Sequence, residues 1–146
     1  MEFQEGFEML FEDGAGSLWR TAQAIPEEKL DWMPGGEART ARQLLEELVT
    51  TTTFTAQMIR DMKMPEMTEE KLPKSITELE KLHKAAITDF LKAVSEFPED
   101  KLQEKLDLPW GNLTFFQIIS YPYWNMMYHF GQISYIQLLY GDKEMY

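Results

Sequence analysis

Apolar side chains recur every three or four positions in four stretches of the chain, and this spacing predicts four amphipathic helices. The predicted helices span residues 3–24, 40–62, 75–97 and 114–140, and the proline-bearing segment 25–36 is expected to be a connector with room for one helical turn. No stretch alternates with period two over more than a few residues, so we expect a strand content near zero. The clearest stripe belongs to the third helix and consists of Ile76, Leu79, His83, Ile87, Phe90, Val94 and Phe97.

Helix-start signals support three of these boundaries. A hydroxyl residue is followed three positions later by glutamine or glutamate, which predicts a capping box, at Thr40–Gln43, Ser75–Glu78 and Thr114–Gln117. The first helix lacks such a signal, and its glycines at 6, 14 and 16 predict a break near residue 13. Long helices joined by moderate loops predict one domain over residues 1–146, an all-α, antiparallel four-helix bundle.

Three polar residues follow one another on a single face of the fourth helix, and their flanks are apolar. Asn125, His129 and Gln132 share this face, and the spacing of four between the first two lets both side chains converge on one atom. Paired metal ligands on helices use this spacing, and imidazole is a good ligand for zinc, nickel or iron. The alternative is a cluster that hydrogen-bonds internally or to a trapped water. Pro122, one turn earlier, predicts a kink.

Gln132 from this cluster and three further residues are candidates for lining a pocket near it. Trp124 and Tyr128 flank it on the fourth helix. His83 lies on the core stripe of the third helix, where it would complete the site if that stripe faced the same cavity. A lone histidine in such a stripe is more often a satisfied core residue, so both interpretations stay open.

Composition narrows the function classes. The chain has 14 basic and 25 acidic residues, a net charge of −11, which disfavours binding to nucleic acid or to an anionic membrane surface. It has no cysteine, which excludes disulfides, metal sites with cysteine thiolates and cysteine nucleophiles. Without a spanning segment or signal peptide in the sequence, we expect a soluble cytoplasmic protein. The fourth helix is apolar on most of its circumference, which predicts a second buried side and therefore a homodimer.

Two segments resemble the DinB/YfiT-like superfamily, and the similarity in pattern covers nearly the whole chain. The first runs from Leu30-Asp31-Trp32-Met33-Pro34 through Thr40 to Leu48 and is similar to the family's Trp-x-Pro connector and Ser/Thr-capped second helix. The second combines the loop 108–114 with the stretch from Asn125 to Ile133, which resembles the family's HxxxH-x-Gly-Gln signature.

This resemblance implies an up-down-down-up bundle, often dimeric, with a divalent metal held by three histidines. One histidine comes from the second helix and two come from HxxxH. Here Glu47 and Asn125 stand at two of these positions, and only His129 is retained. The resemblance therefore implies a mixed site of Glu47, Asn125 and His129 for zinc, nickel or manganese. Such a set is harder than three imidazoles and would hold zinc or nickel less firmly, so a site without metal is the alternative. A further alternative pairs Glu47 with a protonated His129, which would raise the pKa of that histidine.

Two classes of function follow, and the sequence does not decide whether the chain is an enzyme. The first is a metal-dependent enzyme of the hydrolase or thiol S-transferase type, as implied by the resemblance, with Glu47 as ligand or general base. The second is a non-catalytic bundle that binds a small ligand or is purely structural. We expect a small molecule as the substrate of the enzyme or as the ligand of the non-catalytic binding bundle.

Overall fold

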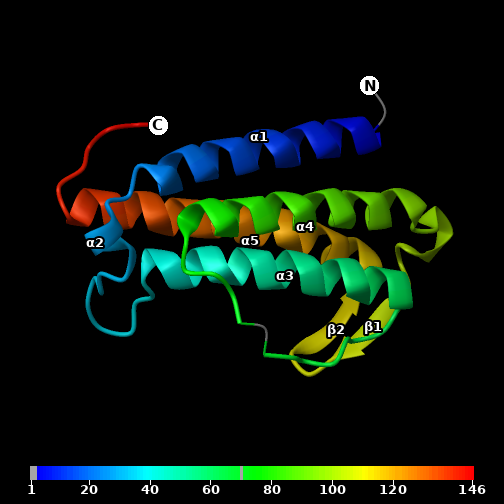
Figure 1. Ribbon diagram of the computed structural model, residues 1–146. Helices are drawn as coiled ribbons and strands as arrows, with labels where there is room; N and C mark the ends of the chain where they lie inside the picture. The colour runs from blue at the N-terminus through cyan, green and yellow to red at the C-terminus, as the bar shows by residue number, and fades with distance from the viewer. Residues whose placement is uncertain (1–2, 70) are drawn as a thin grey trace.

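Four long helices pack side by side in the computed structural model, which describes residues 3–69 and 71–146 (Figure 1). They are α1 (Phe3–Gln23), α3 (Ala41–Asp61), α4 (Ile76–Glu96) and α5 (Phe115–Leu139), with the single-turn α2 (Glu27–Leu30) after α1. Figure 1 shows α1 and α5 running in one direction and α3 and α4 in the other, with the α3–α4 loop returning along the bundle. Helices α1 and α3 each pack against both α4 and α5. The predicted up-down-down-up bundle is confirmed.

Hydroxyl side chains cap the starts of three helices, as predicted. The hydroxyl groups of Thr40 before α3 and Thr114 before α5 each accept a hydrogen bond from the backbone N–H three residues on. In return, the backbone N–H of each threonine donates to the side-chain oxygen of the glutamine at that position. Ser75 accepts in the same way from the Glu78 N–H at the start of α4, but among the described residues the reciprocal Glu78 contact of the predicted capping box is absent. These bonds satisfy N–H groups that have no partner within the helix, so the sequence fixes where each helix begins.

Helix α1 continues without the predicted break near residue 13. The glycine that suggested a break is instead a point of close packing between helices. A Cβ atom on Gly14 would lie 2.9 Å from Cε of Met126 and 3.2 Å from Sδ of Met127. The missing side chain lets α1 approach α5, and this packing outweighs the low helix propensity of glycine.

A small antiparallel hairpin corrects the expectation of almost no strand. Strands β1 (Lys105–Leu108) and β2 (Gly111–Thr114) pair with Leu106 opposite Leu113. A 3-10 turn (Glu99–Lys101) precedes them. The two-residue connection and the positive φ of 147° at Gly111 close the turn, because glycine has no Cβ to clash there. Each strand has four residues, which is too short for an alternating pattern to stand out from the sequence.

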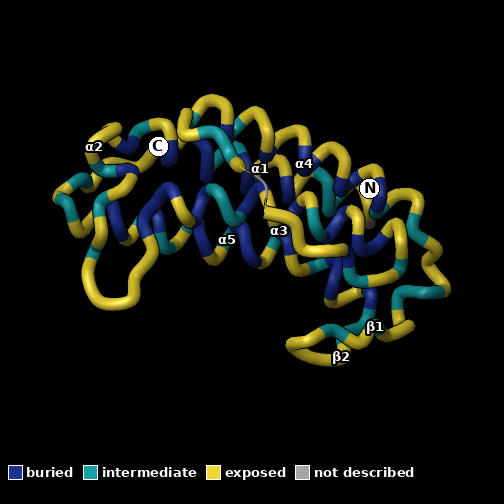
Figure 2. Tube along the Cα trace, turned by 60° about the horizontal axis from the view of Figure 1, so that its bottom comes forward, coloured by how far each residue is buried: buried dark blue, intermediate teal, exposed yellow. Residues whose placement is uncertain are grey.

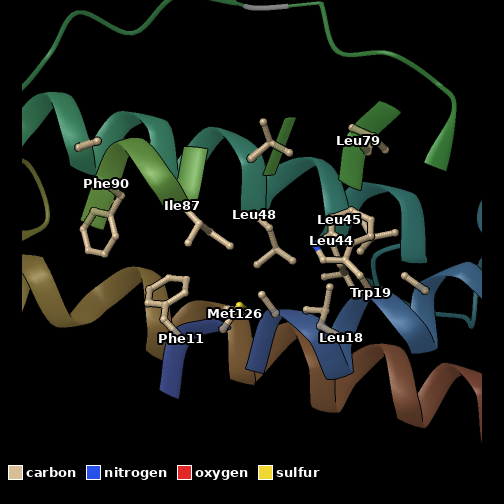
Figure 3. Close-up of a cluster of buried hydrophobic side chains, with 14 of the residues drawn as sticks. Phe11, Leu18, Trp19, Leu44, Leu45, Leu48, Leu79, Ile87, Phe90 and Met126 are labelled. Atoms are coloured by element: carbon tan, nitrogen blue, oxygen red, sulfur yellow. The ribbon is translucent and has the colours of Figure 1, made fainter. Parts of the chain in front are cut away.

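The hydrophobic core fills the space between the four helices (Figure 3). Its largest fully buried side chains include Phe11 and Trp19 from α1, Leu44 and Leu48 from α3, and Phe90 from α4. In Figure 2, buried and exposed positions alternate along each helix, as amphipathic segments require. In the part of the chain that the structure describes, no helix is long and apolar enough to cross a membrane.

Candidate functional site

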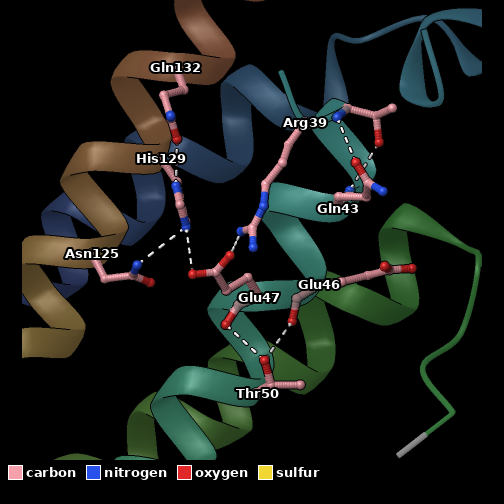
Figure 4. Close-up of polar contacts among 9 residues, drawn as sticks. Arg39, Gln43, Glu46, Glu47, Thr50, Asn125, His129 and Gln132 are labelled. Carbon is pink, nitrogen blue, oxygen red and sulfur yellow. Dashed lines mark hydrogen bonds and ion pairs between the residues drawn. The ribbon is translucent and has the colours of Figure 1, made fainter. Parts of the chain in front are cut away.

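The structure brings Glu47, Asn125 and His129 together between α3 and α5 (Figure 4). Oε1 of Glu47 lies 3.3 Å from Nε2 of His129, and the side-chain amide of Asn125 lies 3.2 Å from the same nitrogen. Asn125 and His129 are buried, whereas the Glu47 side chain keeps 27% of its surface exposed. Asn125 and His129 meet because they stand one turn apart on α5, and Glu47 reaches them across the helix–helix contact.

The side chain of Gln132 hydrogen-bonds to the other nitrogen of this imidazole. Its Oε1 lies 2.6 Å from Nδ1 of His129. Burial lowers the pKa of His129, the Gln132 hydrogen bond partly opposes that effect, and the positive charge of Arg39 lowers the pKa further. The ring is therefore neutral near pH 7. The alternative in which Glu47 raises the pKa of a protonated His129 is wrong, because desolvation and Arg39 prevail.

Arg39 is a member of this site that the sequence did not reveal. Its guanidinium forms an ion pair with Oε2 of Glu47, which leaves Oε1 directed at His129. Arg39 lies in the connector directly before the N-cap Thr40. No sequence pattern at this position predicts that its side chain pairs with a residue eight positions further along the chain. The carboxylate at Glu47 is thus oriented from one side by a cation and faces an imidazole on the other.

One buried polar atom at the site lacks a partner. Among the described residues, nothing hydrogen-bonds to Oδ1 of Asn125, although its side chain is almost wholly buried. An unsatisfied buried oxygen costs about 1–3 kcal/mol. The oxygen and nitrogen of an amide exchange places when the side chain turns over, and this turn would direct Oδ1 at the His129 Nε2 position instead. Because the single proton of the neutral ring is on Nδ1, facing Gln132, a cation beside Nε2 rather than a proton on it would then satisfy the oxygen.

The donor atoms at this site have the spacing that one bound metal ion requires. Two ligand atoms that are each about 2.1 Å from a metal, at angles of 90–110°, lie roughly 3.0–3.4 Å apart. The observed separation from His129 Nε2 to Glu47 Oε1 falls in this interval, and so does the separation to the Asn125 amide nitrogen, whose place Oδ1 would take when the amide is turned over. Among residues 3–69 and 71–146, however, no group of three His, Cys, Asp or Glu side chains is placed to hold a metal. The set offers two strong ligands and one amide oxygen.

His83 is the second histidine, and it is satisfied within the core. Trp19 Nε1 donates to its Nδ1 at 3.0 Å, and its Nε2 lies 3.4 Å from Oγ1 of Thr52. Because indole nitrogen only donates, Nδ1 must accept and Nε2 must carry the proton. Burial lowers the pKa of His83 to about 4. Its partners come from α1 and α3, and none of them belongs to the Glu47–His129 cluster.

Trp124 and Tyr128 lie on the outer side of α5. Their exposed fractions are 59% and 54%, and their rings stack on each other with centroids 5.4 Å apart. The Tyr128 ring also contacts that of His129 at 5.8 Å. Both residues therefore flank the site from the surface, rather than lining the pocket described next.

A largely apolar pocket of about 600 Å³ lies beside the polar cluster. Helix α3, the hairpin, the start of α5 and the loop after α3 form its walls, which include Thr51, Phe54, Glu66, Trp110, Leu113, Ile118 and Tyr121. Thr51 is one turn beyond Glu47 on α3, and Tyr121 is one turn before Asn125 on α5. The pocket is thus one helical turn from the cluster and has the volume of a small-molecule site.

Comparison with known proteins places this chain and its fold in a family. A model of the DinB superfamily matches residues 10–133, a range that contains Glu47, Asn125 and His129. The crystal structure of the DinB-like protein YjoA from Bacillus subtilis is similar with a TM-score of 0.73 and 15% sequence identity, over 95% of this chain and 94% of that one. No curated protein matches the sequence. The chain belongs to the DinB superfamily.

Proposed function

We propose that Glu47, Asn125 and His129 hold one divalent metal ion and that the chain is a metal-dependent enzyme of the hydrolase or thiol S-transferase type. The observation that supports this most directly is the convergence of Glu47 Oε1 and the Asn125 amide on Nε2 of a buried neutral histidine. The unpartnered Oδ1 of Asn125 is a further argument, because a cation would satisfy it.

The chain's own residues would prepare the site for the ion. Gln132 Oε1 accepts the Nδ1–H of His129, which leaves the Nε2 lone pair free. Arg39 fixes Oε2 of Glu47 so that Oε1 stays in place. Oxygen donors in two of three positions favour manganese over zinc or nickel. A bound divalent ion would lower the pKa of a water or thiol held beside it and orient that group.

The substrate would be a small molecule with an apolar body. The neighbouring pocket presents Phe54, Leu113 and Ile118, with Thr51 and Glu66 as polar contacts. A molecule bound there would place one end a single helical turn from Glu47 and Asn125. The reacting group would therefore be a polar terminus of a mostly apolar substrate.

The first test is metal content per chain, measured on protein purified without a histidine tag or chelator and then titrated with manganese, zinc and nickel. We expect close to one equivalent, and we expect His129→Gln to lose it. His83→Gln is the matched control, because it removes the only other histidine and should keep the metal. Unchanged stoichiometry in His129→Gln would remove His129 from the site, and no binding of any of the three ions would refute the metal proposal.

A second candidate is a ligand-binding bundle that acts without metal. The Arg39 guanidinium already neutralises Glu47, so this carboxylate does not need a dication to be stable where it lies. Ligands that enter the pocket would then raise the melting temperature of chelator-treated protein. Stabilisation that appears only after manganese is restored would favour the enzyme instead.

A further inference from the structure

The wall of the pocket between α3, the hairpin and α5 contains a single formal charge. Of the fourteen residues that line it, only Glu66 is charged, and none is lysine or arginine. Glu66 lies exposed in the loop after α3, and it has no ion-pair or hydrogen-bond partner among residues 3–69 and 71–146. A free carboxylate is common in a chain with 25 acidic residues, so this one matters because of what surrounds it.

Three aromatic rings share this wall with Glu66. Phe54 comes from α3, Trp110 from the turn of the hairpin and Tyr121 from α5. Trp110 and Tyr121 are 61% and 45% exposed, so much of each ring is open to an occupant. Figure 1 shows the loop after α3 running past the β1–β2 turn, in agreement with the shared pocket. The face of an aromatic ring is the negative part of its quadrupole, so the rings attract the same sign of charge as the carboxylate does.

The rest of the wall offers nothing that would hold an anion. Helix α3 contributes hydroxyl and amide side chains, which are uncharged. The hydroxyl groups of Thr50 and Thr55 donate to backbone carbonyls of their own helix, so they present oxygen lone pairs to the pocket. An anion in the pocket would therefore have no cationic partner and would face the charge of Glu66. A cation meets the opposite situation, and the net charge of −11 draws cations to this chain.

We propose that this pocket binds an organic ammonium ion with an apolar body, and that its charged head lies between the Glu66 carboxylate and the rings of Trp110 and Tyr121. This assigns a chemical class to the substrate. It rests on the proposed function only in taking the occupant as a substrate, because binding of the head requires no metal. Repulsion from a dication at His129 and from Arg39 would keep the head away from the polar cluster, so the head and the reacting terminus are separate groups of one molecule.

The test is calorimetric titration of the chelator-treated whole chain with three probes of similar size. Phenyltrimethylammonium is the cation, tert-butylbenzene has the same shape with carbon in place of the charged nitrogen, and benzoate is the anion. We expect the cation to bind at least about tenfold more tightly than its neutral isostere, since two rings and one carboxylate favour the charge. Benzoate should not bind at millimolar concentration.

Variants locate the charged head. Glu66→Gln should raise the Kd of the cation about fivefold and leave that of tert-butylbenzene within about twofold. Glu69→Gln is the matched control, because it removes the same charge from an exposed position in the same loop but does not line the pocket. Trp110→Leu should also weaken the cation about fivefold, and Trp110→Phe, which keeps a ring face, should restore most of the affinity. Circular dichroism would establish that each variant is folded.

Three outcomes would overturn the proposal. The first is a cation that binds no more tightly than tert-butylbenzene, or does not bind at all. The second is tighter binding of benzoate. The third is an equal loss of affinity in Glu66→Gln and Glu69→Gln, because the overall charge of the chain would then explain the attraction. Metal content is measured separately, so failure of the metal proposal would leave cation binding intact, and failure of cation binding would leave the metal proposal intact.

Discussion

Lowering the pH from 7 to 5 should destabilise the fold through His83, one of the best-defined polar groups in the core. The folded protein keeps His83 neutral, because burial lowers its pKa to about 4 and Trp19 already donates to Nδ1, the nitrogen that would take the proton. The unfolded chain gains a proton near the ordinary pKa of 6.5. Below that pH the unfolded state binds more protons, so stability falls with falling pH until the folded pKa is reached.

The size of this effect follows from the two pKa values. A shift from 6.5 to about 4 corresponds to roughly 3 kcal/mol in total. About 2 kcal/mol of it should be lost between pH 7 and pH 5, a range in which most carboxylates remain ionised. For a domain of this size, that loss lowers the melting temperature by roughly 5–10 °C.

The assay is urea unfolding followed by circular dichroism at pH 7, 6 and 5, on wild type and His83→Gln at equal concentration. Glutamine can accept from Trp19 and donate to Thr52 but does not titrate here, so the variant should lose about 2 kcal/mol of the pH dependence. Burial also lowers the pKa of His129, so this histidine contributes to the pH dependence as well. His129→Gln removes that contribution and thereby separates it from the contribution of His83. An equal pH dependence in wild type and His83→Gln would refute the explanation.

Two further predictions concern packing and capping, and urea unfolding tests both. Gly14→Val should lower the free energy of unfolding by about 1–3 kcal/mol, because the new side chain would meet Met126 and Met127. Gly16→Ala should raise it by up to about 1 kcal/mol, because the new Cβ would meet only the flexible end of Arg20 at 3.4 Å. Similar effects at both positions would contradict the close approach of α1 to α5. Thr114→Ala should lower the free energy of unfolding by about 1 kcal/mol, because it removes the N-cap of α5, and Thr114→Ser should restore most of that stability. An alanine variant as stable as wild type would mean that the capping box contributes nothing.

The features that the sequence predicted well are those that depend on near neighbours. The start of α5 at Thr114 and the shared face of Asn125 and His129 both follow from spacings of three or four residues. The features it missed depend on contacts between distant segments. Gly14 was expected to break α1, and only the methionines of α5 explain why it does not. Arg39 pairs with Glu47 because of the course that the irregular segment before α3 takes, and helical or strand periodicity does not predict that course.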